Sequence, residues 1–265
     1  SHSRKNIFST QSYNLRQTTE IFNVTLIYIK IIGPQTIYAH KIIMQEKDTI
    51  IFDLDGTLVD SAPDLHACAN RLLKRYHQPT ISLKQSQKFI GDGVRQFVKL
   101  AWLQSNKEID ESRLTKLQDE FLLDYQNQPA QLSETYPGVR ETLDQLSHFG
   151  YKMAVCTNKP QVAAETLLKN LGLRDYFSQI AGGDFYGVKK PNKLHLLNLL
   201  NDLGKSASSA VMIGDNEHDA HTAKAAETIF IICTYGYARI PLKDIHFDFK
   251  IDRFSELLTL EVFRR

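Results

Sequence analysis

The chain has 265 residues, of which 42% are hydrophobic, and its formal net charge is +2. This length suits one domain with an insertion or two small domains. A net charge so close to zero argues against an extended nucleic-acid-binding surface. The three cysteines are far apart and odd in number. They exclude a disulfide framework or a paired-cysteine metal site and favour a reducing, cytoplasmic compartment.

The beginning of the chain differs from the rest, and we interpret residues 1–47 as an N-terminal extension, either native or left by an expression tag. The first 43 residues contain five basic residues and one acidic residue, a net charge of +4. The apolar stretch at residues 21–32 contains Asn23, Thr25 and Lys30 and is shorter than the roughly 20 apolar residues that span a membrane. We therefore expect a disordered or loosely attached leader, with membrane targeting as the minority alternative.

From residue 48 onward, short apolar runs alternate with helical patterns. Runs rich in β-branched residues predict buried strands at residues 48–54, 151–157, 178–182, 209–215 and 228–234. Amphipathic patterns that end at glycine predict helices at residues 139–150, 161–172 and 192–204. Strands separated by helices are typical of βαβ units. The sequence therefore predicts an α/β fold with a Rossmann-like parallel sheet in a three-layer αβα core.

The segment from residue 64 to residue 135 interrupts this alternation, because it contains no predicted strand. Amphipathic patterns predict helices at residues 64–76, 82–91, 94–103 and 110–126. Residues 126–138 are predicted to form the linker that returns to the sheet. We therefore predict a helical cap domain at residues 64–135, inserted into a core domain formed by residues 48–63 and 136–265.

Polar residues follow the predicted strands or precede a predicted helix. They are Asp53, Asp55, Thr157, Asn158, Lys190, Asp215 and Asp219. Ligands of open parallel sheets bind outside the carboxyl ends of the strands, so we expect these side chains to converge in one crevice. Several carboxylates in one crevice repel one another, and a divalent cation removes that penalty. A site made of oxygen ligands alone indicates Mg²⁺.

The other polar groups fit a phosphoryl group bound opposite the metal. Lys190 and the hydroxyl of Thr157 would supply positive charge and a hydrogen bond there. Asp53 and Asp55 then suit two different roles, one as a nucleophile that forms an aspartyl-phosphate and one as an acid and base. Gly56 permits a tight backbone path that separates the two roles.

Four motifs occur in order on these elements: "DLDGT" (53–57), "CTNK" (156–159), "KKP" (189–191) and "GDNEHD" (214–219). Over about residues 44–258 the sequence resembles the haloacid dehalogenase superfamily of phosphotransferases. A finer resemblance to bacterial phosphoglycolate phosphatases rests on seven segments. They are "FDLDGTLVDSAPDL" (52–65), "IGDGV" (90–94), "YPGVRETLDQL" (136–146), "TNKP" (157–160), "GGD" (182–184), "AKAAE" (223–227) and "TYGY" (234–237).

The resemblance implies a Mg²⁺-dependent phosphatase that hydrolyses a small phosphomonoester, with 2-phosphoglycolate as the leading candidate. It implies that Asp53 attacks phosphorus and that Asp55 protonates the leaving oxygen and later activates water. It places the metal on Asp53, on the backbone carbonyl of Asp55 and on Asp215, with Asp219 in support. The residues that it assigns to phosphate binding are Thr157, Asn158 and Lys190. The helical insertion resembles the family's cap, which closes over the substrate.

The sequence departs from the family pattern at Glu227, where the family usually has glycine, and at Asn216, where serine is more usual. Glu227 is expected to distort the end of the preceding helix, because glycine is preferred where φ is positive. Neither departure removes a catalytic group.

Three alternatives stay open from the sequence: a β-phosphoglucomutase-like phosphomutase, a phosphatase for pyrophosphate or a nucleoside monophosphate, and a non-catalytic binding protein. Dehalogenation also uses an aspartate nucleophile but needs no metal, so the presence of Asp55 and Asp215 argues against it. Arg95 and Lys99 are candidates for contact with a substrate carboxylate, although a solvated helix face is the favoured interpretation. The expected partner is a small phosphorylated metabolite, with no nucleic acid and no membrane, and the chain is expected to be a monomer or a homodimer.

Overall fold

The computed structural model describes residues 26–31, 37–42, 47–105, 108–127 and 131–263, the first two ranges by their backbone alone. It divides into two compact units, residues 1–44 and residues 45–264. In the first unit, β1 (Leu26–Ile31) pairs antiparallel with β2 (Ile37–Ile42). Both segments are rich in β-branched and aromatic residues, which favour strands. The hairpin lies within the N-terminal extension, and the expectation of a disordered or loosely attached leader stays a prediction.

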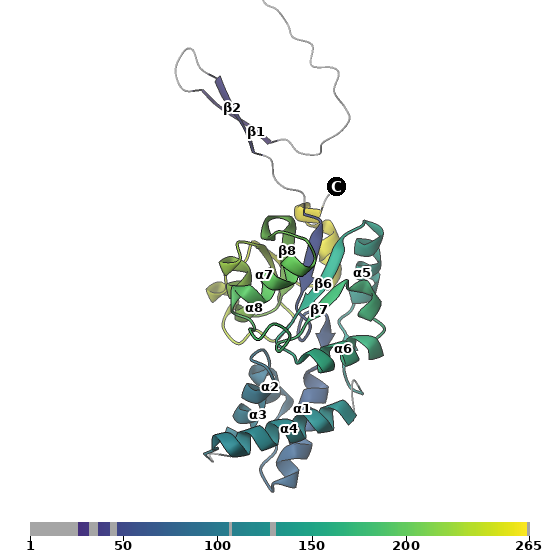
Figure 1. Cartoon of the computed structure of the whole chain (residues 1–265), viewed down its shortest axis with the longest axis vertical. Helices are drawn as coiled ribbons and strands as arrows, with labels where there is room; N and C mark the ends of the chain where they lie inside the picture. The colour runs from purple at the N-terminus through teal and green to yellow at the C-terminus, as the bar shows by residue number, and fades with distance from the viewer. Residues whose placement is uncertain (1–25, 32–36, 43–46, 106–107, 128–130, 264–265) are drawn as a thin grey trace, which may run out of the picture. The chain divides into compact units, whose positions relative to one another are not determined.

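A parallel sheet in the order β10-β9-β8-β3-β6-β7 lies at the centre of the second unit (Figure 1). Its strands are β3 (Thr49–Phe52), β6 (Lys152–Cys156), β7 (Gln179–Ala181), β8 (Ala210–Gly214), β9 (Ile229–Cys233) and β10 (Phe249–Ile251). The first of these, β3, pairs in parallel with both β6 and β8 and is therefore central. The five strands predicted from the sequence are confirmed, and β10 is an addition to them.

Helices cover both faces of the sheet (Figure 1). On one face lie α5 (Val139–His148) and α6 (Gln161–Asn170), and on the other α7 (Lys193–Asp202) and α8 (Glu217–Ala225). Alternate residues of β3 enter the two apolar layers: Ile50 and Phe52 pack in the first, and Ile51 packs in the second. Burial on both faces explains the continuous apolar runs of the strands. The predicted three-layer core is confirmed.

Four further helices form an apolar cluster of their own. They are α1 (Ala62–Arg75), α2 (Leu83–Phe89), α3 (Val94–Leu103) and α4 (Glu111–Asn127). We call them the cap. The chain enters the cap after β4 (Val59–Asp60) and leaves it through β5 (Glu134–Thr135), and these two strands pair antiparallel. The sequence predicts no strand at β5, because a two-residue pairing has no periodicity to detect. The exact domain boundaries stay a prediction.

Helix α8 ends in a left-handed turn at Glu227, whose φ is +57°. The backbone N–H of Glu227 donates to the carbonyl of Lys224 at 3.1 Å, and that of Thr228 donates to the carbonyl of Ala223 at 2.9 Å. These are the bonds that close a helix end when glycine follows it. The expected distortion is therefore absent, and Glu227 instead adopts a conformation that glycine would adopt at lower cost.

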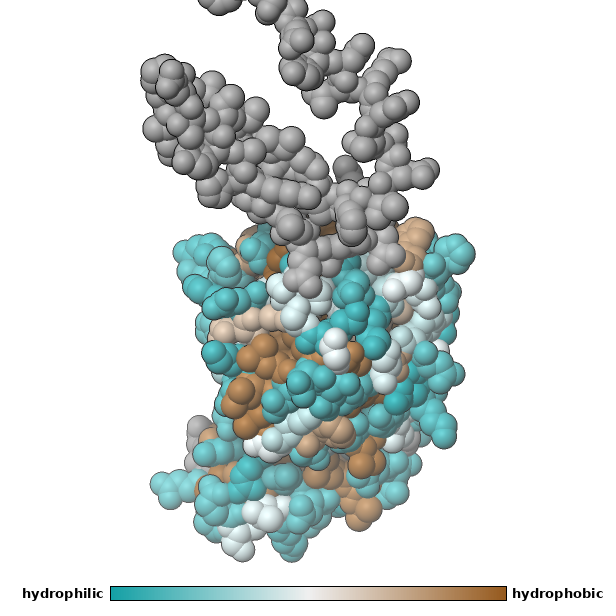
Figure 2. Space-filling model, turned by 45° about the horizontal axis from the view of Figure 1, so that its top comes forward, coloured by the Kyte–Doolittle hydropathy of each residue, from teal (hydrophilic) through white to brown (hydrophobic). Residues whose placement is uncertain are grey.

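Polar residues cover most of the described surface on the side drawn in Figure 2, and apolar residues form patches among them. The large apolar side chains that stay exposed come from separate elements: Leu83, Leu123, Leu132, Phe149, Val162, Phe185, Leu194 and Ile240. Among the described residues, no helix has both the length and the apolar character that crossing a bilayer requires. All three cysteines are free and buried, so no disulfide links these elements.

Candidate active site

Three aspartates converge at the carboxyl edge of the sheet. Asp53 follows β3, Asp215 follows β8, and Asp219 lies in the first turn of α8. Because β3 and β8 are paired in parallel, their ends coincide. One carboxylate oxygen from each aspartate lies within 4.8 Å of the others, and all three side chains are buried. The structure thus brings together three of the residues that the sequence singled out.

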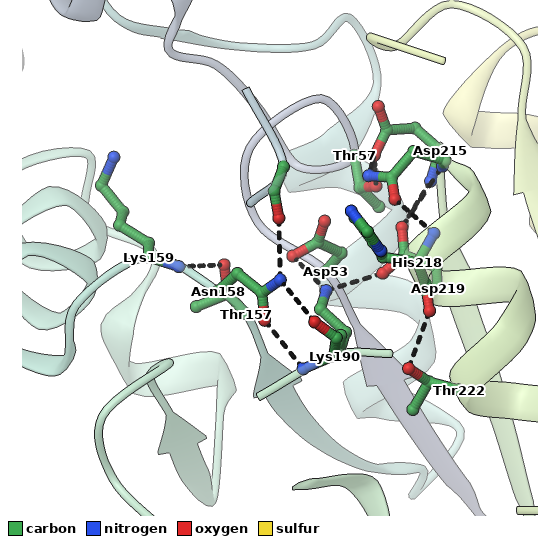
Figure 3. A network of polar contacts seen from close by, with 12 residues as sticks. Asp53, Thr57, Thr157, Asn158, Lys159, Lys190, Asp215, His218, Asp219 and Thr222 are labelled. Carbon is green, nitrogen blue, oxygen red and sulfur yellow. Dashed lines mark hydrogen bonds and ion pairs between the residues drawn. The ribbon is translucent and has the colours of Figure 1, made fainter. Parts of the chain in front are cut away.

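The ammonium of Lys190 lies between two of these carboxylates (Figure 3). Its Nζ is 2.8 Å from Oδ1 of Asp53 and 2.6 Å from Oδ1 of Asp219. Burial alone would lower the pKa of Lys190, but the charges of Asp219 and Asp53 outweigh it and raise that pKa above its ordinary value. Lys190 is therefore charged, and it offsets one of the three negative charges.

Burial, and after it the remaining negative charge, raises the pKa values of Asp53 and Asp215. Burial, followed by the charge of Asp219, raises the pKa of Asp53 to about 7. Burial, Asp219 and Asp53 together raise the pKa of Asp215 well above its ordinary value. Three carboxylates and one ammonium leave a net charge of −2 when all are ionised. A divalent cation matches that charge, and the oxygen-only donor set fits Mg²⁺.

Asp219 supports the cluster from the start of α8. Its Oδ2 accepts hydrogen bonds from the backbone N–H groups of Asp215 at 3.1 Å and Asn216 at 3.3 Å. This is one half of a capping box whose other half is the Asn216 side chain. Because Oδ1 of Asp219 already binds Lys190, both of its oxygens are engaged. The oxygens of Asp215 also accept hydrogen bonds, from the side-chain amide of Asn216 at 3.1 Å and from the backbone N–H of Tyr237 at 2.6 Å, and the assignment of Asp53 and Asp215 as metal ligands with Asp219 in support stays a prediction.

A sharp turn at Gly56 separates Asp53 from Asp55. The φ of Gly56 is +89°, and a Cβ built there would lie 2.3 Å from Oδ2 of Asp215. Both facts require glycine, in agreement with the tight path expected from the sequence. Oδ2 of Asp215 also accepts a hydrogen bond from the backbone N–H of Tyr237 at 2.6 Å. The turn thus packs directly against the carboxylate cluster.

The carboxylate of Asp55 has a separate set of partners. Its Oδ1 lies 3.1 Å from Nζ of Lys159 and accepts a hydrogen bond from the hydroxyl of Ser61. It is not among the three clustered carboxylates, and metal binding by its backbone carbonyl stays a prediction. Sequence reasoning gave Lys159 no role, although the residue lies inside the "CTNK" motif and a signal was therefore present.

Thr157 and Asn158 follow β6 and are buried. Oγ1 of Thr157 accepts a hydrogen bond from the backbone N–H of Lys159 at 3.2 Å. The side-chain amide of Asn158 donates to the carbonyls of Gly91 at 2.7 Å and Lys190 at 2.9 Å, and Oδ1 accepts from the N–H of Lys190 at 2.9 Å. Asn158 therefore ties the Lys190 loop to the cap. The phosphate contacts of all three predicted residues stay predictions.

A loop of the cap also binds the core through Asp92. Its carboxylate contacts Arg239 and lies 2.5 Å from Nε2 of His218. Lys189 donates to the backbone carbonyl of Asp92 at 2.6 Å, and Arg239 also pairs with Glu217 at 2.5 Å. Hydrogen bonds from His218 and Arg239 hold the pKa of Asp92 below its ordinary value. These contacts hold residues 91–93 against the core.

A small cleft lies between the cap and the core. The core contributes Asp53, Asp55, Thr157, Asn158 and Lys159, and the cap contributes Leu65, Ile90, Gly91, Gly93, Val94 and Phe97. Arg95 does not line the cleft and instead pairs with Gln118 and Glu111 of α4. A concave site with a polar side and an apolar side suits a small molecule.

Comparison with known proteins gives consistent matches over most of the chain. The family model of haloacid dehalogenase-like hydrolases matches residues 50–233. A phosphoglycolate phosphatase of Agrobacterium fabrum is 35% identical over 207 residues, which cover 78% of this chain and 89% of that protein. A phosphoglycolate phosphatase of Cereibacter sphaeroides is 38% identical over 196 residues, which cover 74% of this chain and 89% of that protein.

A solved structure has the same architecture. The crystal structure of a predicted phosphoglycolate phosphatase from Haemophilus somnus superimposes with a TM-score of 0.76 at 32% sequence identity. The match covers 82% of this chain and 98% of that one. Together with the ordered motifs and the site that they build, these matches show that the chain belongs to the haloacid dehalogenase-like hydrolase family.

Proposed function

We propose that this protein is a Mg²⁺-dependent phosphatase for a small phosphomonoester, most specifically 2-phosphoglycolate, and that it acts through an aspartyl-phosphate on Asp53. The observation that carries the proposal is the position of Asp53. It lines the cleft at the end of β3, 2.8 Å from the ammonium of Lys190 and inside the carboxylate cluster. The two relatives at 35% and 38% identity, both named phosphoglycolate phosphatase, support the substrate class.

The phosphoryl group would bind between the carboxylate cluster and the end of β6. Lys190 would neutralise charge on one phosphoryl oxygen, and the buried hydroxyl of Thr157 would donate a hydrogen bond to another. Asp53, Asp215 and the backbone carbonyl of Asp55 would hold Mg²⁺, which, when bound, supplies positive charge to the phosphoryl oxygens. Two negatively charged reactants, the carboxylate and the phosphate, can then approach each other.

Two carboxylates perform the bond changes. Asp53 forms a bond to phosphorus in line with the ester oxygen, whose bond to phosphorus breaks. Asp55 gives its proton to that leaving oxygen and then takes one from the water that hydrolyses the aspartyl-phosphate. Because Lys159 and Ser61 both bind Oδ1 of Asp55, Oδ2 is the oxygen that faces this proton exchange. The cap covers the cleft and limits the access of bulk water.

Release of inorganic phosphate tests the proposal. The substrates are 2-phosphoglycolate, sugar phosphates, nucleoside monophosphates and pyrophosphate, each with and without Mg²⁺. We expect Mg²⁺-dependent release that is fastest with 2-phosphoglycolate, loss of it in Asp53→Asn, and retention of it in Asp119→Asn, which changes an exposed aspartate of α4. Slow release from many of these substrates would rule out a preference for 2-phosphoglycolate and would still support phosphatase activity. Isomerisation of a sugar phosphate without phosphate release would favour the phosphomutase alternative. The absence of any reaction would refute both the phosphatase and the phosphomutase assignment.

A further inference from the structure

Lys159 is a buried cation at the junction of cap and core. Only 6% of the residue is exposed. Its Nζ lies 3.1 Å from Oδ1 of Asp55 and 4.8 Å from the ring centre of Tyr125, a residue of the cap helix α4. Burial alone would lower the pKa of Lys159, but the charge of Asp55 outweighs it and raises that pKa above its ordinary value. The side chain is therefore an ammonium group packed against an aromatic ring.

Lys159 is also the one cationic side chain among the described residues that line the cleft. Lys190, the other buried ammonium near the reacting atoms, binds Asp53 and Asp219, and in the proposed reaction its third donor binds a phosphoryl oxygen. An ammonium has three N–H donors, and the contacts of Lys159 with Asp55 and with the Tyr125 ring leave at least one of them for a ligand. Any second negative charge on a substrate would therefore meet Lys159 on the core side of the cleft.

The position of Asp55 sets how far that second charge lies from the ester. In the proposed reaction Asp55 approaches the leaving oxygen to about 2.7 Å, the length of an O–H···O hydrogen bond. Nζ of Lys159 lies 3.1 Å from the same carboxylate. The leaving oxygen and the ammonium are thus neighbours of one carboxylate group. A substrate charge reaches Lys159 when it stands on the carbon next to the one that bears the ester oxygen.

The opposite wall of the cleft narrows the choice further. Leu65, Ile90, Val94 and Phe97 are apolar, and Gly91 and Gly93 have no side chain. The carbonyl of Gly91 already accepts a hydrogen bond from Asn158. Hydroxyl groups of a sugar would lose their hydrogen bonds to water against this wall, which costs free energy. A short leaving group with one charge on the core side fits better than a long polar one.

We propose that Lys159 is the specificity-determining residue, which binds a carboxylate attached directly to the phosphate-bearing carbon and so selects short phosphomonoesters that carry a second negative group. This inference rests on the proposed phosphatase function and adds the group that recognises the substrate. The bond is charge-assisted and lies in a largely desolvated site. Removal of the Lys159 ammonium should weaken binding of the carboxylated substrate strongly. The substrate carboxylate would still lose its hydrogen bonds to water in the cleft, and no charged partner would replace them.

The test compares two substrates of similar size in one variant, Lys159→Met. The substrates are 2-phosphoglycolate and ethyl phosphate, which has a methyl group in place of the carboxylate. Methionine keeps an unbranched side chain against Tyr125 and removes the charge. The readout is the ratio of kcat/KM for the two substrates. We expect this ratio to fall roughly 10- to 100-fold, the range for a lost hydrogen bond to a charged group, while Lys159→Arg retains most of the preference.

Two results distinguish failure of the proposed role of Lys159 from failure of the proposed phosphatase function. If both substrates lose activity equally in Lys159→Met, Lys159 acts only by positioning Asp55, and the inference is overturned while the phosphatase stands. If the wild-type protein releases phosphate from neither substrate with Mg²⁺ present, the proposed function itself fails. Lys99→Met is the matched control, because Lys99 lies on α3 outside the cleft lining, and its ratio should equal that of the wild type.

Inhibition by glycolate gives a second measurement that does not depend on how fast the variant turns over. Glycolate carries the carboxylate without the phosphate, and it should inhibit the hydrolysis of ethyl phosphate competitively in the wild-type protein. The inhibition constant should rise roughly 10-fold or more in Lys159→Met. An unchanged constant in a folded variant would contradict carboxylate binding by Lys159.

Discussion

Asp53→Asn removes one negative charge from the buried cluster with almost no change in shape. The pKa of Asp53 is raised from 3.8 to about 7, first by burial and then by the charge of Asp219, against the opposing effect of Lys190. A carboxyl group whose pKa is higher in the folded state binds its proton more tightly there, so its ionisation destabilises the fold. A shift of about 3 units corresponds to about 4 kcal/mol at 1.36 kcal/mol per unit.

The sign of the pH dependence follows from this shift. The destabilisation is absent below about pH 4, where the group is protonated in both states, grows as pH rises to about 7, and is complete above that. Asparagine carries no charge at any of these pH values. The metal-free Asp53→Asn protein should therefore match the wild type near pH 4 and exceed its free energy of unfolding by up to about 4 kcal/mol at pH 8.

Urea unfolding in the presence of a chelator, at several pH values from 4 to 8, measures this difference. Asp119→Asn, on the exposed face of α4, is the matched control and should show no pH-dependent gain. Phosphate release is measured on the same preparations and should be lost only in Asp53→Asn. With saturating Mg²⁺ the wild type should recover stability, because a ligand that binds only the folded state stabilises it. A metal-free variant that is less stable than the wild type at pH 8 would refute the reasoning.

Three further substitutions test other parts of the structure. Glu227→Gly should raise the free energy of unfolding by about 1 kcal/mol, because φ at this position is +57° and costs L residues about that much; thermal unfolding checks it, and a lower melting temperature would contradict it. Asp92→Ala removes the contacts to Arg239 and should raise KM roughly tenfold and speed proteolysis of the cap loop. Gly56→Ala should abolish phosphate release and lower stability, because its Cβ would meet Asp215 at 2.3 Å; a fully active variant would exclude the tight turn.

The sequence was sufficient for most of the core, because buried parallel strands and glycine-terminated helices leave strong local patterns. Within the bounds that the structure gives the five predicted strands, all interior residues are apolar and buried. Strand β10 (Phe249–Ile251) could not be found this way. It is three residues long, Lys250 lies in its middle, and it exists only because β9 offers it a parallel edge. The β4–β5 pair is similar, since tertiary pairing and not local preference makes it a strand.

The convergence of the site's polar side chains was predictable to the same extent, whereas their roles stay predictions. Asp53, Asp215 and Lys190 lie together because parallel strands place their carboxyl ends at one edge, a rule that needs no side-chain information. Lys159 shows what the rule leaves out. The "CTNK" motif contains Lys159, but the sequence does not tell whether its side chain is solvated or packed against Tyr125, a residue from a distant cap helix. Only the position of the cap decides which of the two occurs.

The antiparallel pairing of β4 and β5 also bears on how this enzyme family changes over time. Val59 lies opposite Thr135, and Asp60 lies opposite Glu134, so the insertion begins and ends at neighbouring points. A segment closed at its base in this way can grow, shrink or be exchanged at little entropic cost to the rest of the chain. Residues 62–133 can therefore change toward new leaving groups while the residues proposed as catalytic, at the ends of β3 and β8, stay unchanged. A cap from a relative, grafted at these two strands, would transfer substrate preference as a unit.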